Sequence, residues 1–242
     1  MRQGLGSAAL SVAGVMACSA TPGPARAFDW WDALTWDTVF ASVDMDRTST
    51  FLTTGGKKSF ALPDEGTRAF LMGTSGLSLS DVVRARRGKM LFTRIERQQR
   101  LLIGIDRSLG PVYASFGLGP SQAVVPQPGR GPRVRYGLAA DASVWLRPDP
   151  SLYVALAAGA DTANASLWGR ARLGWRPAGS PVAFGPELMG SVERTTGKTR
   201  LGLHVGEPAF LSRFDVTLSA GWQWDQSRRS SHYLTATLLG RY

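Results

Sequence analysis

The chain has 242 residues, with 28 lysines and arginines against 18 acidic residues, and Cys18 is its single cysteine. One cysteine excludes a small fold held together by disulfide bonds. The positive net charge favours anionic partners such as lipid head groups or acidic glycans, although a generally basic proteome would also explain it.

The first 27 residues have the pattern of a secretory signal peptide. Arg2 gives a positive start, an apolar run follows from Leu5 to Met16, and Ala25-Arg26-Ala27 forms an A-x-A cleavage site. The apolar run is too short to span a bilayer. We therefore expect export and removal of residues 1–27, which leaves a net charge of +8. No nucleic-acid partner is expected for an exported protein.

The alternative is a lipoprotein signal, because Val15-Met16-Ala17-Cys18 resembles a lipobox. In that case Cys18 would carry a lipid, whereas cleavage after Ala27 leaves a mature chain with no cysteine. The change of composition that begins at Phe28 favours cleavage after Ala27.

After the signal, residues 28–35 form an aromatic lead, which is expected to be either an interfacial plug or disordered. From residue 36 to residue 242, short alternating runs are separated by Gly, Pro, Asp and Ser, which is typical of one all-β domain. About twelve strands are expected, at residues 36–45, 50–60, 66–76, 98–107, 111–119, 134–146, 150–160, 164–175, 180–192, 199–206, 213–224 and 231–242.

The stretch 214–224, FDVTLSAGWQW, shows the alternation most clearly. One face is apolar throughout, with Phe214, Val216, Leu218, Ala220, Trp222 and Trp224, and the other face has no large apolar residue. Strands of about ten residues suit a tilted transmembrane strand better than a soluble sheet. We expect the Phe214 face to meet lipid, with Trp222 and Trp224 near the interface, and the Thr217 face to line a lumen.

The connections favour a barrel that starts and ends in the periplasm. The two longest loops, 77–97 and 120–133, fall on the outer side, and the expected periplasmic turns are short. The last strand ends on the aromatic Tyr242, as in strands that outer-membrane assembly machinery recognises. The sequence thus predicts an all-β, antiparallel up-and-down transmembrane β-barrel of about 12 strands. A soluble periplasmic barrel with its apolar face inward, around an apolar ligand, has the same alternation and stays open.

Three stretches of the C-terminal half resemble a known family: FGPELMGS (184–191), TRLGLHVG (199–206) and LSAGWQWD (218–225). Their order and spacing resemble the cellulose biosynthesis protein BcsS family of exported β-barrel-like proteins. The third expected strand departs from the family pattern, because GTRAFLMGTSGL keeps Gly73 and Gly76 without tyrosines. The resemblance implies a non-enzymatic outer-membrane barrel that assists cellulose synthesis or export.

Catalysis finds little support in the residues, because the chain has only two histidines. For His204, on a polar face, the favoured interpretation is a structural hydrogen bond to a carboxylate such as Glu187. His232 follows Ser230 and Ser231, which invites comparison with lipid A deacylases, but Ser231 and His232 would point to opposite faces. Ser230 shares the face of His232, but it is expected to lie in the loop before the last strand. A lipid-modifying esterase, of lipid A deacylase or phospholipase type, is the alternative function. No metal or cofactor is expected.

The polar faces carry charged residues that we expect inside the barrel. The candidate lumen residues are Arg135, Arg170, Arg172, Glu187, Arg200, His204, Arg213 and Asp215. The favoured interpretation is that these residues form ion pairs that fill the interior of a narrow barrel, because buried ions need partners. A twelve-strand barrel is intermediate in size between barrels whose interior is filled by side chains and barrels with an open channel. The functional alternative is a polar surface that handles a glycan, with Trp145 and Trp168 offering rings for sugars. The expected partners are outer-membrane lipid or lipopolysaccharide and, by the resemblance, cellulose or components of its synthase complex.

Overall fold

The computed structural model describes residues 37–85, 89–127, 130–180, 182–194, 196–206, 214–226 and 230–241. The expected signal peptide, the aromatic lead at 28–35 and Tyr242 lie outside the described residues. The expectations about cleavage, lipidation and the terminal aromatic residue therefore stay predictions.

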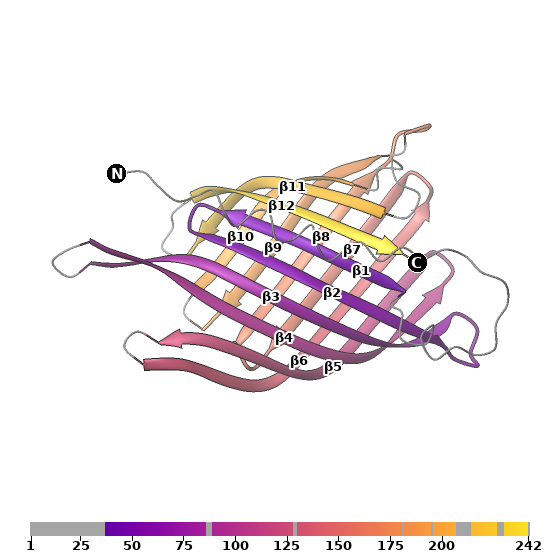
Figure 1. Cartoon of the computed structure of the whole chain (residues 1–242). Helices are drawn as coiled ribbons and strands as arrows, with labels where there is room; N and C mark the ends of the chain where they lie inside the picture. Colours follow the sequence, from indigo (N-terminus) through magenta and orange to yellow (C-terminus); the bar gives the residue numbers. More distant parts are fainter. Residues whose placement is uncertain are drawn as a thin grey trace, which may run out of the picture. The chain divides into compact units, whose positions relative to one another are not determined.

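The described part of the chain is a closed barrel of twelve antiparallel strands (Figure 1). Each strand pairs with its neighbours in sequence, and β1 pairs with β12. Closure pairs every strand on both sides along the barrel wall, as a membrane-spanning sheet requires. The predicted fold class and strand number are confirmed. The strands are β1 (Thr38–Asp46), β2 (Ser49–Ala61), β3 (Thr67–Ala85), β4 (Lys89–Leu109), β5 (Val112–Gln127), β6 (Arg130–Asp149), β7 (Leu152–Asp161), β8 (Ser166–Trp175), β9 (Ala183–Glu193), β10 (Thr196–Gly206), β11 (Phe214–Asp225) and β12 (Ser230–Arg241).

The long loops predicted at 77–97 and 120–133 are wrong, because most of these residues continue strands β3 to β6. The resulting hairpins reach beyond the other strands at one end of the barrel (Figure 1). The β3–β4 ladder runs without a break from Thr67–Arg107 to Ala85–Lys89. Many basic residues in this stretch hide the alternation in the sequence, but a partner strand of the same length supplies a complete hydrogen-bond ladder.

Pro120 is the reason why the sequence predicts the end of the fifth strand at residue 119. Proline has no N–H to donate, so it normally marks a strand end or an interrupted ladder. Here the β4–β5 pairing passes from Arg100–Ser121 directly to Ile103–Leu118, while β5 stays paired with β6 at Pro120. The proline therefore interrupts one ladder only, and the strand continues.

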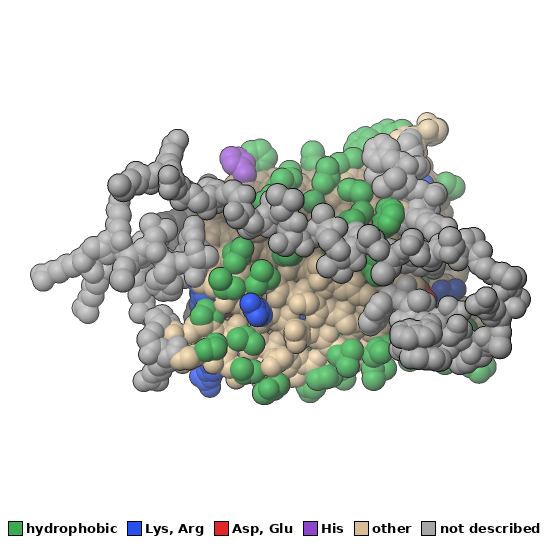
Figure 2. Space-filling model, viewed as in Figure 1, with side chains coloured by type: hydrophobic (Ala, Val, Ile, Leu, Met, Phe, Trp, Pro, Cys, Tyr) green, Lys and Arg blue, Asp and Glu red, His purple; other side chains and the backbone are tan. Residues whose placement is uncertain are grey.

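The barrel carries its apolar side chains outside and its polar side chains inside. On the outer surface Leu203 is 67% exposed, whereas Ser219 on the inner wall is 2% exposed. Hydrophobic side chains are spread over the visible outer face (Figure 2). An outer apolar surface is what a lipid-facing barrel requires. The predicted outward direction of the Phe214 face and inward direction of the Thr217 face are confirmed, and the alternative of a barrel with its apolar face inward is wrong. Among the described residues, no helix is long and apolar enough to cross a membrane.

Some aromatic rings on the inner wall lie flat against glycines of a neighbouring strand. Tyr153 of β7 faces Gly174 of β8, and a Cβ added at Gly174 would lie 2.0 Å from the Tyr153 ring. We expect Gly174→Ala to destabilise the barrel by about 1–3 kcal/mol, because the ring would have to leave its place. Urea unfolding in lipid vesicles measures this loss.

The matched control for Gly174→Ala is Gly190→Ala. Gly190 lies on the outer face of β9, and an added Cβ there would meet nothing within 4 Å. Gly190→Ala should therefore leave unfolding nearly unchanged. Equal losses in the two variants would mean that the Tyr153 ring does not restrict residue 174.

Candidate functional site

The inner wall of the C-terminal half holds a buried carboxylate, Glu187, surrounded by donors from three other strands. Arg172 lies directly opposite Glu187 on the β8–β9 ladder, and its Nε donates to Glu187 Oε2 over 2.5 Å. Arg170 Nε lies 3.2 Å from the same oxygen. Ser219 Oγ of β11 donates to Oε2 over 3.1 Å, and Tyr233 OH of β12 donates to Oε1 over 3.4 Å. We call these five residues the Glu187 cluster.

A second group, the Arg200 cluster, joins β10 and β11 to the first strand of the barrel. Arg200 Nε donates to Gln223 Oε1 over 2.6 Å, and its guanidinium forms an ion pair with Asp44. Lys198 Nζ lies 2.6 Å from Asp46 Oδ2, which also accepts from Gln223 Nε2 over 3.1 Å. These contacts tie strands near the end of the chain to β1.

Tyr233 connects the two clusters. Its hydroxyl reaches Glu187, and the Arg200 guanidinium lies over its ring, 5.0 Å from the centroid. Such a cation–π contact is stronger where the cation is shielded from water, and Arg200 is buried. The two clusters therefore form one continuous polar network across β8 to β12 and β1.

A third group, the Asp161 cluster, lies on the other side of the inner wall. Asp161 accepts from Gln98 Nε2 over 2.5 Å, from Arg100 Nε over 2.9 Å and from Ser121 Oγ over 2.9 Å. The sequence analysis missed Asp161 and Arg100 as site residues. Both occupy inward positions of expected strands or strand ends, so the alternation was the signal that could have found them.

The structure brings five of the predicted lumen residues close together and separates the others. Arg170, Arg172, Glu187 and Arg200 belong to the network above, and His204 lies opposite Ser219 on the β10–β11 ladder. Arg135 lies elsewhere, in the β5–β6 hairpin, near the positive charges of Arg194 and Arg133. Asp215 forms an ion pair with Arg241 near the end of β12, and Arg213 lies outside the described residues.

The partner expected for His204 is wrong. Its Nε2 makes a 2.6 Å hydrogen bond with Tyr153 OH rather than with a carboxylate, and the side chain is 1% exposed. Tyr153 also stacks on Trp145, with ring centroids 5.5 Å apart. The histidine is thus held in a packed, aromatic part of the wall, which suits a structural hydrogen bond.

The second histidine lies on the outer surface. On β12 the register places His232 opposite the outward Trp222, and Ser231 opposite the inward Gln223. Ser231 and His232 therefore point to opposite faces, as the alternation predicts. The expected loop position of Ser230 is wrong, because Ser230 begins β12, pairs with Trp224 and shares the outer face with His232. Among the described residues, no group of three or more His, Cys, Asp or Glu side chains is arranged to hold a metal ion.

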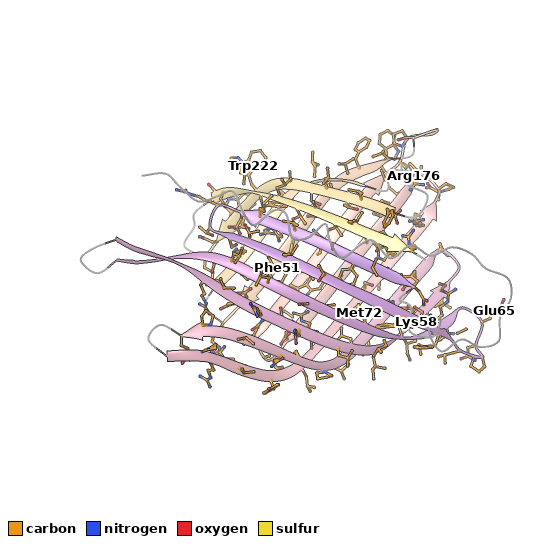
Figure 3. The ribbon with its side chains drawn as sticks, viewed as in Figure 1. Phe51, Lys58, Glu65, Met72, Arg176 and Trp222 are labelled. Carbon is orange, nitrogen blue, oxygen red and sulfur yellow. The ribbon has the colours of Figure 1, made fainter. Side chains whose placement is uncertain are left out.

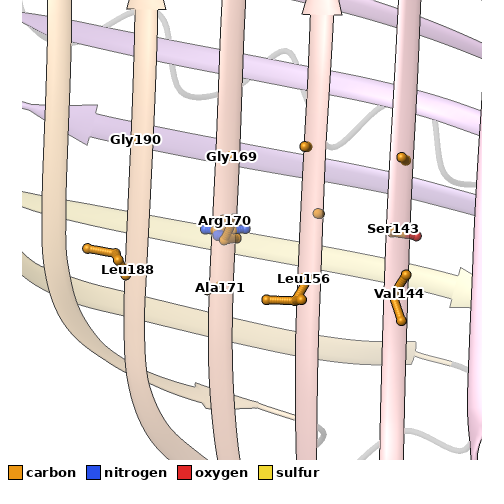
Figure 4. A pocket seen from close by; sticks show the side chains of 11 residues that line it. Ser143, Val144, Leu156, Gly169, Arg170, Ala171, Leu188 and Gly190 are labelled. Atoms are coloured by element: carbon orange, nitrogen blue, oxygen red, sulfur yellow. The ribbon is translucent and has the colours of Figure 1, made fainter.

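A shallow apolar hollow of about 360 Å³ lies on the outer face of β6 to β9 (Figure 4). Val144, Leu156 and Leu188 rise around small residues such as Gly169 and Ala171. Its lining offers almost no hydrogen-bonding groups, and it faces the side that meets lipid. This hollow is therefore a feature of the lipid-facing surface and not of the polar inner wall.

Several solved structures have a similar fold. They include a KdgM porin, with 9% identity and a TM-score of 0.49, covering 85% of this chain and 99% of that one. LpxR from Salmonella typhimurium has 11% identity and a TM-score of 0.48, covering 85% and 100%. Outer membrane phospholipase A from Escherichia coli has 8% identity and a TM-score of 0.44, covering 86% and 92%. Likenesses of this size carry no argument about function.

No curated protein matches the chain. A family model described as "Cellulose biosynthesis protein BcsS" matches residues 38–242, from the first residue of β1 to the end of the chain. The match covers all twelve strands and includes the three stretches that carry the resemblance in the sequence. The chain therefore belongs to the cellulose biosynthesis protein BcsS family.

Proposed function

We propose that the chain is a non-catalytic barrel of the outer membrane that assists the synthesis or export of cellulose. The observation that carries this proposal is the family match over residues 38–242. The apolar outer surface and the closed sheet support the membrane location, because such a surface is stable only against lipid.

The placement of the histidines supports a non-catalytic role. A general base must reach a substrate, but His204 is buried and bonded to Tyr153. Ser231 and His232 point to opposite faces. Ser230 and His232 share the outer face, but the described lining of their hollow contains no acidic side chain to orient the histidine. These placements favour the cellulose role over the esterase alternative.

The charged clusters suit the structural interpretation better than direct contact with a glycan. Arg170 and Arg172 both bind Glu187, so a sugar would have to break these ion pairs to reach them. A neutral row of hydroxyl side chains offers a better surface for a neutral glucan. The row crosses four neighbouring strands in register and consists of Thr217, Thr237, Ser42 and Thr53. We assign this row as the proposed glucan contact.

If the chain assists cellulose synthesis or export, deleting the gene should lower secreted cellulose and leave lipid A acylation intact. If the chain were a lipid-modifying esterase, the deletion would instead change lipid A acylation and leave cellulose unchanged. Cellulose-dye binding and mass spectrometry of lipid A measure the two effects. Unchanged cellulose in the deletion strain, under conditions where the parent strain makes cellulose, would remove the proposed role.

A pair of adjacent substitutions tests the hydroxyl row. Thr237→Trp places a large ring on the inner wall, whereas Ala236→Trp places the same ring on the outer face of β12. If the row contacts the glucan, only Thr237→Trp should lower cellulose at normal barrel abundance. Equal cellulose in the two strains would contradict the assignment of the row.

A further inference from the structure

A polar hollow lies on the outer surface at one rim of the barrel, apart from the inner wall. Its volume is about 470 Å³, and it is lined by Arg47, Trp222, Ser230, Ser231 and His232. Arg47 belongs to the β1–β2 turn, and the other residues belong to β11 and β12. This rim is opposite the one where Thr38 and Arg241 pair, and it is the rim from which the long hairpins extend.

Three of the β11 and β12 side chains at the hollow, those of Trp222, Ser230 and His232, face outward, whereas Ser231 points to the inner wall. Trp222 stands on the outer surface of β11 and is 57% exposed (Figure 3). His232 lies opposite it on β12, with the two ring centroids 5.6 Å apart and the planes at 54°. Ser230 lies two residues before His232, on the same outer face. An aromatic face, an imidazole and a hydroxyl group therefore line one hollow.

Arg47 provides an available positive charge at the hollow. It is exposed, and it forms no ion pair with the other described residues. The carboxylate of the preceding residue, Asp46, points inward to Lys198 and Arg200. Because that acid is already paired, it does not neutralise Arg47 on the outer side.

These groups together match one chemical class of ligand. A guanidinium binds phosphate through paired, charge-assisted hydrogen bonds. An exposed indole face can pack on the apolar face of a sugar ring, and a serine hydroxyl and an imidazole can bond sugar hydroxyls. Tryptophan side chains at a barrel rim also lie at the level of lipid head groups.

We propose that this hollow binds the phosphorylated sugar head group of a lipid in the outer leaflet. The hollow lies on the outer face, beside the exposed Trp224. This position indicates that the bound phosphorylated sugar belongs to a lipid and is not a free sugar phosphate. The inference requires the barrel to lie in the outer membrane with this rim outward. It does not require a role in cellulose synthesis, so unchanged cellulose in a deletion strain would leave it intact.

The test uses the barrel purified from membranes in detergent and titrated with lipid A that carries its phosphates. Binding is followed by native mass spectrometry. Arg47→Gln should weaken binding about tenfold, the loss of one charge-assisted contact. Lipid A without phosphates should bind the parent and Arg47→Gln barrels with equal, weaker affinity. Trp222→Leu should weaken binding of both lipids, because the indole contacts the sugar.

Matched controls lie at the opposite rim, on the outer face. Arg107→Gln and Trp175→Leu remove the same side-chain types there and should leave binding unchanged. Equal binding by Arg47→Gln and Arg107→Gln would overturn the proposal, as would equal affinity of the parent barrel for the two lipids. Glucosamine 1-phosphate that binds as tightly as the whole lipid would overturn the assignment of a lipid source.

Discussion

Replacing Glu187 with alanine is expected to destabilise the barrel by about 3–5 kcal/mol. The substitution removes the acceptor shared by Arg170 and Arg172 and leaves two guanidinium groups on the inner wall without their carboxylate. An unpaired charge away from bulk water costs more than the ion pair itself contributes. Urea unfolding in lipid vesicles, followed by tryptophan fluorescence, measures the loss.

Two further variants separate the charge from the shape of Glu187. Glu187→Gln keeps an acceptor oxygen and should lose less stability than the alanine variant. Replacing Glu187, Arg170 and Arg172 together with leucine or methionine should recover most of the loss, because no unpaired charge remains. A triple variant as unstable as Glu187→Ala would show that the ion pairs are not the cause.

Leu218→Arg is expected to destabilise the barrel by about 2–4 kcal/mol, the cost of a cation on the lipid face near the bilayer midplane. Leu218 lies near the middle of β11, faces outward and is flanked across the ladders by Val205 and Ala236. Its described neighbours on that face, which include Val205, Ala220 and Ala236, carry no acidic side chain to pair with the new charge. The same unfolding measurement in vesicles gives the difference.

A substitution at the neighbouring residue 217 tests whether the cost depends on which face of β11 carries the charge. Thr217→Arg places the cation on the inner wall, beside the hydroxyl of Thr237 and the backbone of Gly206, where polar partners are available. Its cost should be well below that of Leu218→Arg. If the inward arginine cost more than the outward one, the faces of β11 would be the reverse of those described.

The fold was predictable because its main signal is local. A period of two residues assigns each side chain of a strand to a face, whatever its partners are, and the faces of β6, β8, β10 and β11 follow from it. The positions of the strand ends depend less on the local sequence, because β3 to β6 continue only where a neighbouring strand of equal length is present. Basic residues and Pro120 conceal that continuation in the sequence.

The candidate site was predictable in composition but not in contacts. Alternation places Arg170, Arg172 and Glu187 on the inner wall, yet the partners of a side chain depend on register between strands far apart in sequence. The Arg200–Asp44 pair joins residues 156 positions apart, and His204 of β10 meets Tyr153 of β7 although β8 and β9 lie between their strands. No local pattern encodes such contacts.

The pairing of β1 with β12 has a consequence for how the barrel forms. Its partners Thr38 and Arg241 come from opposite ends of the described chain, so this ladder closes only after the last strand is present. Joining such distant segments carries a large loop-closure entropy, which slows folding. Until that step, β1 and β12 each present an unpaired edge that can associate with another chain. The Arg200–Asp44 and Lys198–Asp46 pairs lie beside this ladder and stabilise it once closed, so they would act mainly by slowing its reopening.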